Sequence, residues 1–189
     1  MKIVLSRPVS TCLRGQVTAN VRWNQGQYVA NSESVAAMWS ALADARPDLV
    51  DEGTTYEAWH FCDNESDANE LADLVLAGTK RATAGLLWSY EAEGEPLPVV
   101  GDLSVVTDWE GRARCVIRTT SVEVVPFAAV TPEFAAIEGE GDGSLEYWRK
   151  AHEAAFTREL ANSGRTLEPA SPVVCQCFEI VLGGTSSDS

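Results

Sequence analysis

The chain has 189 residues, of which 45% are hydrophobic and 22% charged, and its formal net charge is −14. This length is sufficient for one compact domain with its own hydrophobic core. The negative charge disfavours extended, non-specific binding to long nucleic acids, because contact with phosphate backbones requires clustered Lys and Arg. A small uncharged substrate, or a local basic pocket, is compatible with it.

The sequence shows no membrane segment and no disulfide framework. No stretch approaches the ~20 apolar residues of a membrane-spanning helix, and Ile3-Val4-Leu5 is too short for the apolar centre of a signal peptide. We therefore expect a cytoplasmic protein. The five cysteines are an odd number and are scattered apart from Cys175 and Cys177, so we expect reduced thiols. Of the two histidines neither lies near a cysteine pair, so no zinc site is predicted.

The first third of the chain predicts two helices after an irregular start. Residues 1–31 show no sustained helical or strand period and are interpreted as an N-terminal extension or mobile arm. Apolar residues at helical spacing predict a helix that is capped by Ser32 and closed by Pro47. A second helix is predicted to begin in a capping box at Asp67 and to end at Gly78.

The remainder predicts strands and one longer helix in irregular order. Leu103–Thr107 and Arg114–Val125 are rich in β-branched residues and are joined by a turn, which is typical of a hairpin. A helix is predicted from about Ser144 to Leu160, and a last strand from Val173 to Leu182. Because a doubly wound parallel sheet would need regular alternation, this order favours an α+β domain, with no internal repeat.

The predicted domain covers residues 32–182. The polar residues 183–189 that follow are expected to be a disordered tail.

The first candidate for chemistry follows the second helix, where Gly78 leads into Lys80, Arg81 and Thr83. A hydroxyl is a weak nucleophile until a base removes its proton, and a Lys with a lowered pKa is such a base. On a straight strand, positions three apart face opposite sides, so Lys80 and Thr83 cooperate only if the backbone bends between them. The alternative is a purely structural role, in which Lys80 and Arg81 complement the helix dipole and Thr83 begins a strand.

The second candidate is the acidic, glycine-rich segment from Glu138 to Ser144. It resembles the start of a calcium loop, but the twelfth position is Arg149, where an EF-hand needs a bidentate carboxylate. Capping of the next helix by Asp142 or Ser144 explains the end of the segment. Capping does not explain Glu138 and Glu140, and the neighbouring glycines allow close approach of the backbone to a ligand.

Three further residues have two interpretations each. Trp88 and Tyr90 are either a platform for stacking a base or part of the core. His152 lies one helical turn after Trp148, and it is either a packed or capping histidine or a catalytic one.

Taken together, these segments resemble the larger bacterial members of the ASCH family. The likeness covers residues 35–182 and rests chiefly on Gly78-x-Lys80-x-x-Thr83 and on Glu138-Gly139-Glu140-Gly141-Asp142-x-Ser144-Leu145-x-x-Trp148-Arg149-x-x-His152. The resemblance implies a PUA-like β-barrel with flanking helices, whose pocket faces RNA or a nucleoside. Two activities are associated with the family: hydrolysis of the amide in N4-acylated cytidines, and cleavage of single-stranded RNA helped by a divalent metal.

The resemblance also implies a set of site residues. Lys80, Thr83 and Glu138 match the catalytic set of the small amidohydrolases, with Glu140 as the alternative carboxylate. Residues expected to contact the substrate are Arg81, Trp88, Tyr90, Glu140 and Trp148. No metal ligand and no cofactor is expected for the amidohydrolase. We expect a nucleoside as the partner, with single-stranded RNA as the alternative and no membrane association; the oligomeric state is not predicted.

The leading hypothesis is an amidohydrolase that acts on N4-acetylcytidine or similar acylated cytidines. In one mechanism Lys80 deprotonates Thr83, whose oxygen attacks the acyl carbon, and Glu138 holds Lys80 and passes a proton to the departing cytosine amine. In the other, Glu138 activates water directly, Lys80 stabilises the oxyanion, and Thr83 only orients the substrate. The sequence leaves both open.

Two other hypotheses remain. In a ribonuclease, Glu138, Glu140 and Asp142 would hold Mg²⁺ or Mn²⁺ while Lys80 and Arg81 meet phosphate. In a binding module, the same pocket would recognise a modified base without turning it over. The acidic charge favours the amidohydrolase over the ribonuclease, because a free nucleoside carries no phosphate.

Overall fold

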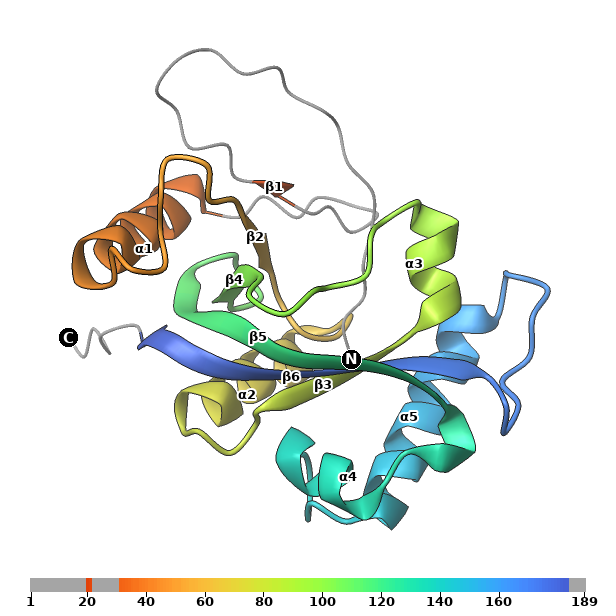
Figure 1. Cartoon of the computed structure of the whole chain (residues 1–189). Helices are drawn as coiled ribbons and strands as arrows, with labels where there is room; N and C mark the ends of the chain where they lie inside the picture. The colour runs from red at the N-terminus through yellow and green to blue at the C-terminus, as the bar shows by residue number, and fades with distance from the viewer. Residues whose placement is uncertain (1–19, 22–30, 184–189) are drawn as a thin grey trace.

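The computed structural model describes residues 20–21 and 31–183. Within these residues, six strands form one mixed sheet in the order β1-β2-β4-β5-β6-β3 (Figure 1). The strands are β1 (Asn20–Val21), β2 (Tyr56–Trp59), β3 (Ala82–Leu86), β4 (Leu103–Thr107), β5 (Ala113–Pro126) and β6 (Pro172–Gly183). Strand β2 is parallel to β1 and to β4, and the other pairs are antiparallel.

The two longest strands, β5 and β6, are neighbours in the sheet. Their register shifts between Val116 and Ile117 and again between Thr119 and Ser121. Such irregularities bend a strand and increase its twist. Beyond β6 lies β3, which is hydrogen-bonded on one side only and is therefore an edge of the sheet. The free edge of β3 is where the candidate site is built.

Helices cover both faces of the sheet (Figure 1). Successive strand residues point to opposite faces; accordingly Val105 packs in the cluster beneath the first helix and Val106 in the cluster beneath the second. At the other end of the sheet, Val174 contacts the third helix and Val173 the last one. The helices are α1 (Ser32–Ala45), α2 (Glu65–Leu76), α3 (Leu87–Glu93), α4 (Pro132–Glu138) and α5 (Leu145–Leu160), with a 3₁₀ turn at Phe127–Ala129.

The first two helices begin at caps that differ from the predicted ones. The side chain of Asn31 accepts the N–H of Ser34 at 3.1 Å, so Asn31 and not Ser32 caps α1. Likewise the side chain of Asn64 accepts the N–H of Asp67 at 3.0 Å, so α2 starts before Asp67. The physical reason is that an Asn side chain can satisfy a free N–H of the first turn as well as Ser or Asp can.

The later caps and strands agree with the prediction. Gly78 follows α2 with a φ of +73°, as a helix stop requires. Ser144 caps α5, because its hydroxyl accepts the N–H of Tyr147 at 3.1 Å. The predicted hairpin is the β4–β5 pair, and the last predicted strand is β6.

Three strands and two α-helices were not predicted as such: β1, β2, β3, α3 and α4. The strands have five residues at most, and β3 is buried at every position, so it shows no alternation of polar and apolar residues. The two helices have seven residues each, too few for a clear helical period.

The α+β, PUA-like fold class is confirmed. None of the helices in the described part of the chain is long and apolar enough to cross a bilayer. The expected extension over residues 1–31 lies largely outside the described residues, although Asn20–Val21 pairs with β2 as strand β1. The expected tail also lies outside them from residue 184 onward. The domain boundaries stay a prediction.

Candidate active site

A buried lysine lies at the centre of the site. Lys80 follows the glycine turn after α2 and precedes β3, and its side chain has no solvent exposure. Its ammonium donates to Oε1 of Glu140 at 2.6 Å and to Oε1 of Glu138 at 3.2 Å. The same nitrogen lies 5.1 Å from the centre of the Phe61 ring, on the β2 side. A charge removed from water in this way must be balanced by its neighbours, and two carboxylates balance it here.

Glu138, the last residue of α4, is held by three donors. Its Oε1 accepts from Lys80 and from the backbone N–H of Ala84 at 3.1 Å, and its Oε2 accepts from the indole N–H of Trp148. The N–H of Ala84 is available because β3 is an edge strand. The carboxylate therefore fixes α4 and α5 against this edge, and it is itself fully buried.

Two glycines bring the carboxylates to Lys80. Gly139 ends α4 with a φ of +67°, and a Cβ there would lie 2.3 Å from the carbonyl oxygen of Thr79. Gly141 has a φ of +57°, and its Cβ would lie 2.3 Å from the ring of Tyr147. Both positions thus need a residue without a side chain. This requirement accounts for the alternation of Glu and Gly in the acidic segment.

The charges of the cluster support one another. Burial lowers the pKa of Lys80, but the two carboxylates outweigh this effect and hold its pKa above the ordinary value. Burial raises the pKa of Glu138 and Glu140, and the positive charge of Lys80 outweighs it, so both pKa values lie below their ordinary range. At neutral pH the site therefore holds an ammonium between two ionised carboxylates.

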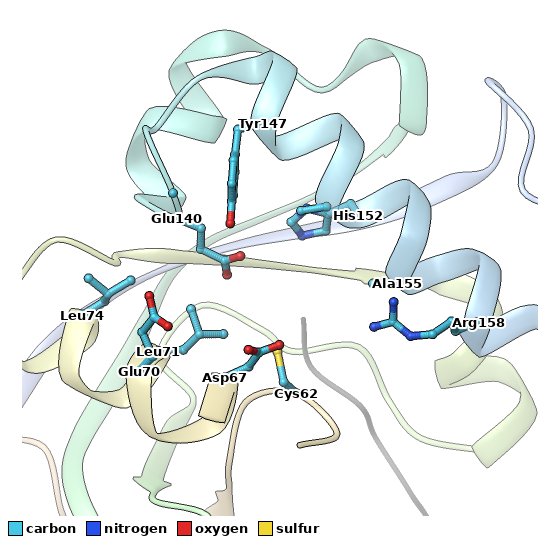
Figure 2. Close-up of a pocket in the computed structure, with 12 residues that line it drawn as sticks. Cys62, Asp67, Glu70, Leu71, Leu74, Glu140, Tyr147, His152, Ala155 and Arg158 are labelled. Carbon is cyan, nitrogen blue, oxygen red and sulfur yellow. The ribbon is translucent and has the colours of Figure 1, made fainter. Parts of the chain in front are cut away.

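A cavity of about 150 Å³ lies beside this cluster, between α2 and α5 (Figure 2). Engineered cavities of roughly this size hold one aromatic ring. The side chains of Glu140 and His152 point into it, and the guanidinium of Arg158 lies at its far end. The lining residues are Cys62, Asp67, Glu70, Leu71, Leu74, Glu140, Gly141, Tyr147, Ala151, His152, Ala155 and Arg158.

His152 carries a buried polar atom that lacks a partner. Its ring is 3% exposed and stacks on Trp148 with ring centroids 4.1 Å apart. The Nδ1 atom is bonded to the carbonyl of Trp148 at 2.9 Å, whereas Nε2 has no hydrogen-bond partner. Oε1 of Glu138 lies 3.6 Å from Nε2. A buried nitrogen in this state is available to a ligand.

The structure brings together four of the residues singled out in the sequence. Lys80, Glu138, Glu140 and Trp148 form one connected network. Of the two carboxylates, only Glu140 lines the cavity. Trp148 is buried in the core and contacts Glu138 rather than the cavity.

Thr83 lies apart from this network. Its hydroxyl is buried and has no hydrogen-bond partner among the described residues, so no bond joins it to Lys80. Successive side chains of β3 point to opposite faces of the sheet. Ala84 packs against α5, so Thr83, which pairs with Gln176, lies on the other face. A role of Thr83 as nucleophile stays a prediction.

The other three predicted contacts do not line the cavity. Arg81 is exposed at the start of β3. Trp88 lies beneath the guanidinium of Arg165 at 4.7 Å, and Tyr90 is 3% exposed in the core below α3. Their contacts with a substrate stay a prediction.

Asp67 and Glu70 line the cavity although the sequence interpretation placed them only at the start of a helix. Their spacing puts them on one side of α2, which the sequence shows. Only the tertiary structure shows that this side of α2 faces the cavity, across from α5.

Comparison with known proteins agrees with the resemblance found in the sequence. The chain is 36% identical to the ASCH domain of Lactobacillus crispatus JV V101, whose crystal structure superimposes with a TM-score of 0.73 over 84% of this chain and 98% of that one. Protein EF3133 of Enterococcus faecalis V583 is 32% identical, with the same TM-score of 0.73 and the same coverage of 84% and 98%. No curated protein matches the chain. Because the profile of the ASCH domain matches residues 57–182, the chain belongs to the ASCH domain family.

Proposed function

We propose that the protein is an amidohydrolase that removes the acyl group from N4-acylated cytidines of the N4-acetylcytidine type, giving cytidine and a carboxylic acid. The ASCH family is linked to RNA-binding and hydrolase roles. The observation that carries the proposal is Lys80, buried between Glu138 and Glu140 beside a cavity whose size suits a single aromatic ring. An ammonium held beside the reacting carbonyl stabilises the oxyanion that forms there.

The charge state of Lys80 favours one of the two mechanisms. A lysine whose pKa is raised by two carboxylates stays protonated, and it cannot take a proton from Thr83. We therefore assign Lys80 the oxyanion role, with water as the nucleophile. Glu140 joins the cavity to Lys80, so an acyl oxygen that takes the place of the Glu140 carboxylate meets the ammonium directly.

The remaining members of the network position this charge. Glu138 holds Lys80 from the side away from the cavity and is anchored by Trp148. Thr83 is part of β3, and its side chain lies on the face opposite Ala84 and α5, so we assign it no part in the attack. The proposed hydrolysis needs no cofactor and no metal.

The ribonuclease alternative finds less support in the geometry. Its three metal-binding carboxylates do not converge: Glu138 and Glu140 neutralise Lys80, while Asp142 is exposed and accepts the N–H of Ser144 at 2.8 Å. Asp67 and Glu70 also make the cavity wall acidic, which repels phosphate. The nucleoside, which carries no phosphate, is the better substrate for such a wall.

The test is to incubate the purified chain with N4-acetylcytidine and, separately, with a labelled single-stranded RNA, each with and without EDTA. Lys80→Met, which keeps most of the side-chain volume, is compared with Lys150→Met, a lysine on the exposed side of α5. We expect cytidine and acetate from the wild type in EDTA, equal activity from Lys150→Met, and none from Lys80→Met.

Circular dichroism establishes that both variants are folded at the assay temperature. Cleavage of RNA alone, lost in EDTA, would replace the proposal by the ribonuclease. Saturable binding of N4-acetylcytidine without product would replace it by the binding module.

A further inference from the structure

We propose that His152 is the proton-transfer residue of this reaction: it takes a proton from the attacking water and returns it to the departing cytosine amine. This role rests on the proposed amidohydrolase function. It goes beyond the site residues expected from the sequence, in which Glu138 moved the proton.

The hydrogen bond at Nδ1 determines the tautomer of His152. A carbonyl oxygen only accepts, so the Nδ1 atom that lies 2.9 Å from the carbonyl of Trp148 carries a hydrogen. In the neutral ring the lone pair then belongs to Nε2. The ring cannot turn freely, because Trp148 stacks on it with an interplanar angle of 15° and Phe156 contacts it edge-on at 5.3 Å between centroids. The ring that carries this lone pair is therefore held in place, with the His152 side chain pointing into the cavity (Figure 2).

The other groups of the cluster are poor bases. Lys80 is protonated, and Glu138 already accepts from Lys80, Ala84 and Trp148. Glu140 accepts from Lys80 at 2.6 Å, and its pKa is lowered by that positive charge. Nε2 of His152 has no hydrogen-bond partner, and the His152 side chain lines the cavity. A neutral imidazole is also the side chain best suited to take and return a proton near pH 7.

The reaction balances with His152 in this role. As the water oxygen bonds to the acyl carbon, one water proton passes to Nε2 and the carbonyl electrons form an oxyanion beside Lys80. When the bond from the acyl carbon to N4 breaks, the oxyanion collapses to the acid, and Nε2–H gives its proton to the amine. The imidazole returns to its neutral form, and the net change is addition of one water across the amide.

Glu138 supports the charged intermediate state of His152. Once Nε2 is protonated, the positive ring lies 3.6 Å from Oε1 of Glu138, which is an attractive distance. Groups that face His152 across the cavity also act on its charge. They are Glu140 from the loop after α4, Asp67 and Glu70 from α2, Cys62 after β2, and Tyr147 and Arg158 from α5 itself.

The test follows the rate of N4-acetylcytidine hydrolysis by the full chain from about pH 5 to pH 9, the range in which a histidine changes charge. In the wild type we expect kcat to fall at acidic pH, as His152 becomes protonated before water attacks. His152→Gln should lower kcat by about 10²- to 10⁴-fold, the usual contribution of a general acid and base, with KM little changed. The acidic limb of the pH profile should disappear with it.

His60→Gln provides the matched control, because the chain has two histidines and His60 does not line the cavity. It also assigns the imidazole signals for NMR. In the wild type, ¹⁵N shifts should show His152 with its hydrogen on Nδ1, and its titration midpoint should equal the midpoint of the kinetic acidic limb. This second measurement needs no substitution of His152, so it holds even where His152→Gln is unstable.

Three results would overturn the role. In the first, His152→Gln keeps kcat within a few fold or keeps the acidic limb. In the second, the NMR midpoint of His152 differs from the kinetic midpoint, or the hydrogen lies on Nε2; in both cases the wild type is active and the amidohydrolase survives. In the third, the wild type releases no cytidine at all, and the proposed function fails together with this role.

Discussion

The two ends of the sheet differ in whether charged side chains are buried beside their apolar core. Beneath α1 the core is apolar, with Trp39 stacked on Tyr56 at 4.1 Å between centroids and Leu42 fully buried. At the β3 edge the apolar core around Phe156 is joined by Lys80 and Glu138, both without solvent exposure. An apolar core stabilises a fold through burial, whereas a buried ion pair is often no better for stability than hydrophobic residues of the same volume. The charged end is thus better explained by function than by folding.

The largest effect is expected from breaking the charged end. Lys80→Met leaves the carboxylates of Glu138 and Glu140 buried without their cation, which typically costs about 3–5 kcal/mol of unfolding free energy. Urea denaturation at neutral pH measures the loss. Arg118→Ala is the control, because it breaks an exposed pair with Glu179 and should cost less than about 1 kcal/mol. Equal losses of unfolding free energy in the two variants would mean that the buried cluster contributes no more to stability than an exposed ion pair.

A loss of stability of similar size is expected at the apolar end, but without a loss of activity. Leu42→Ala opens a cavity in the fully buried core below α1, and such changes cost about 2–5 kcal/mol. Because Leu42 does not contact the site, activity per folded molecule should equal that of the wild type. Denaturation and the N4-acetylcytidine assay on the same samples make the comparison. A loss of activity in the folded variant would show that the two ends are coupled.

A smaller loss is expected from Gly139→Ala. The new Cβ would lie 2.3 Å from the backbone oxygen of Thr79, and a φ of +67° is unfavourable for Ala. Strain of this kind costs about 1–3 kcal/mol. Because the loop carries Glu140, activity should fall more than stability. The matched control is Gly164→Ala, which has a similar φ of +72° but whose Cβ would meet no atom within 4 Å.

The smallest and most diagnostic effect concerns pH. The pKa values of Glu138 and Glu140 are lowered in the fold, so their contribution to stability is present above the ordinary value of 4.5 and is lost as pH falls below it. The pKa of Lys80 is raised, so its contribution is present below 10.5 and is lost as pH rises through the folded value. Between these limits wild-type stability should vary little with pH.

Lys80→Met should reverse the acidic part of this dependence. Without the cation, burial raises the pKa of both carboxylates, and they must take up protons for the chain to fold. The stability of the variant should therefore increase as the pH falls from about 8 to 5. Urea midpoints at several pH values test this sign. A variant that loses stability over the same range would contradict the assignment of Lys80 as the balancing charge.

The sequence alone determined the elements that have strong local signals. Strands β4 and β6, helix α5 with its Ser144 cap and the stop at Gly78 followed from β-branched runs, helical spacing and capping chemistry. The two motifs also indicated the family, and they contained Lys80, Glu138 and Glu140. The interactions that determine these features act between residues close in the chain, so a single sequence is sufficient.

Only the tertiary structure decided how the motif residues divide their roles. Glu138 and Glu140 are separated by one glycine, yet Glu138 is enclosed by three donors and Glu140 faces the cavity. Lys80 and Glu138 lie 58 positions apart in the chain, and they meet because α4 packs against the open edge of β3. The alternation of β3 turns Thr83 away, and the stacking on Trp148 holds the ring of His152 beside the cavity. These outcomes depend on packing between distant segments, which no local pattern specifies.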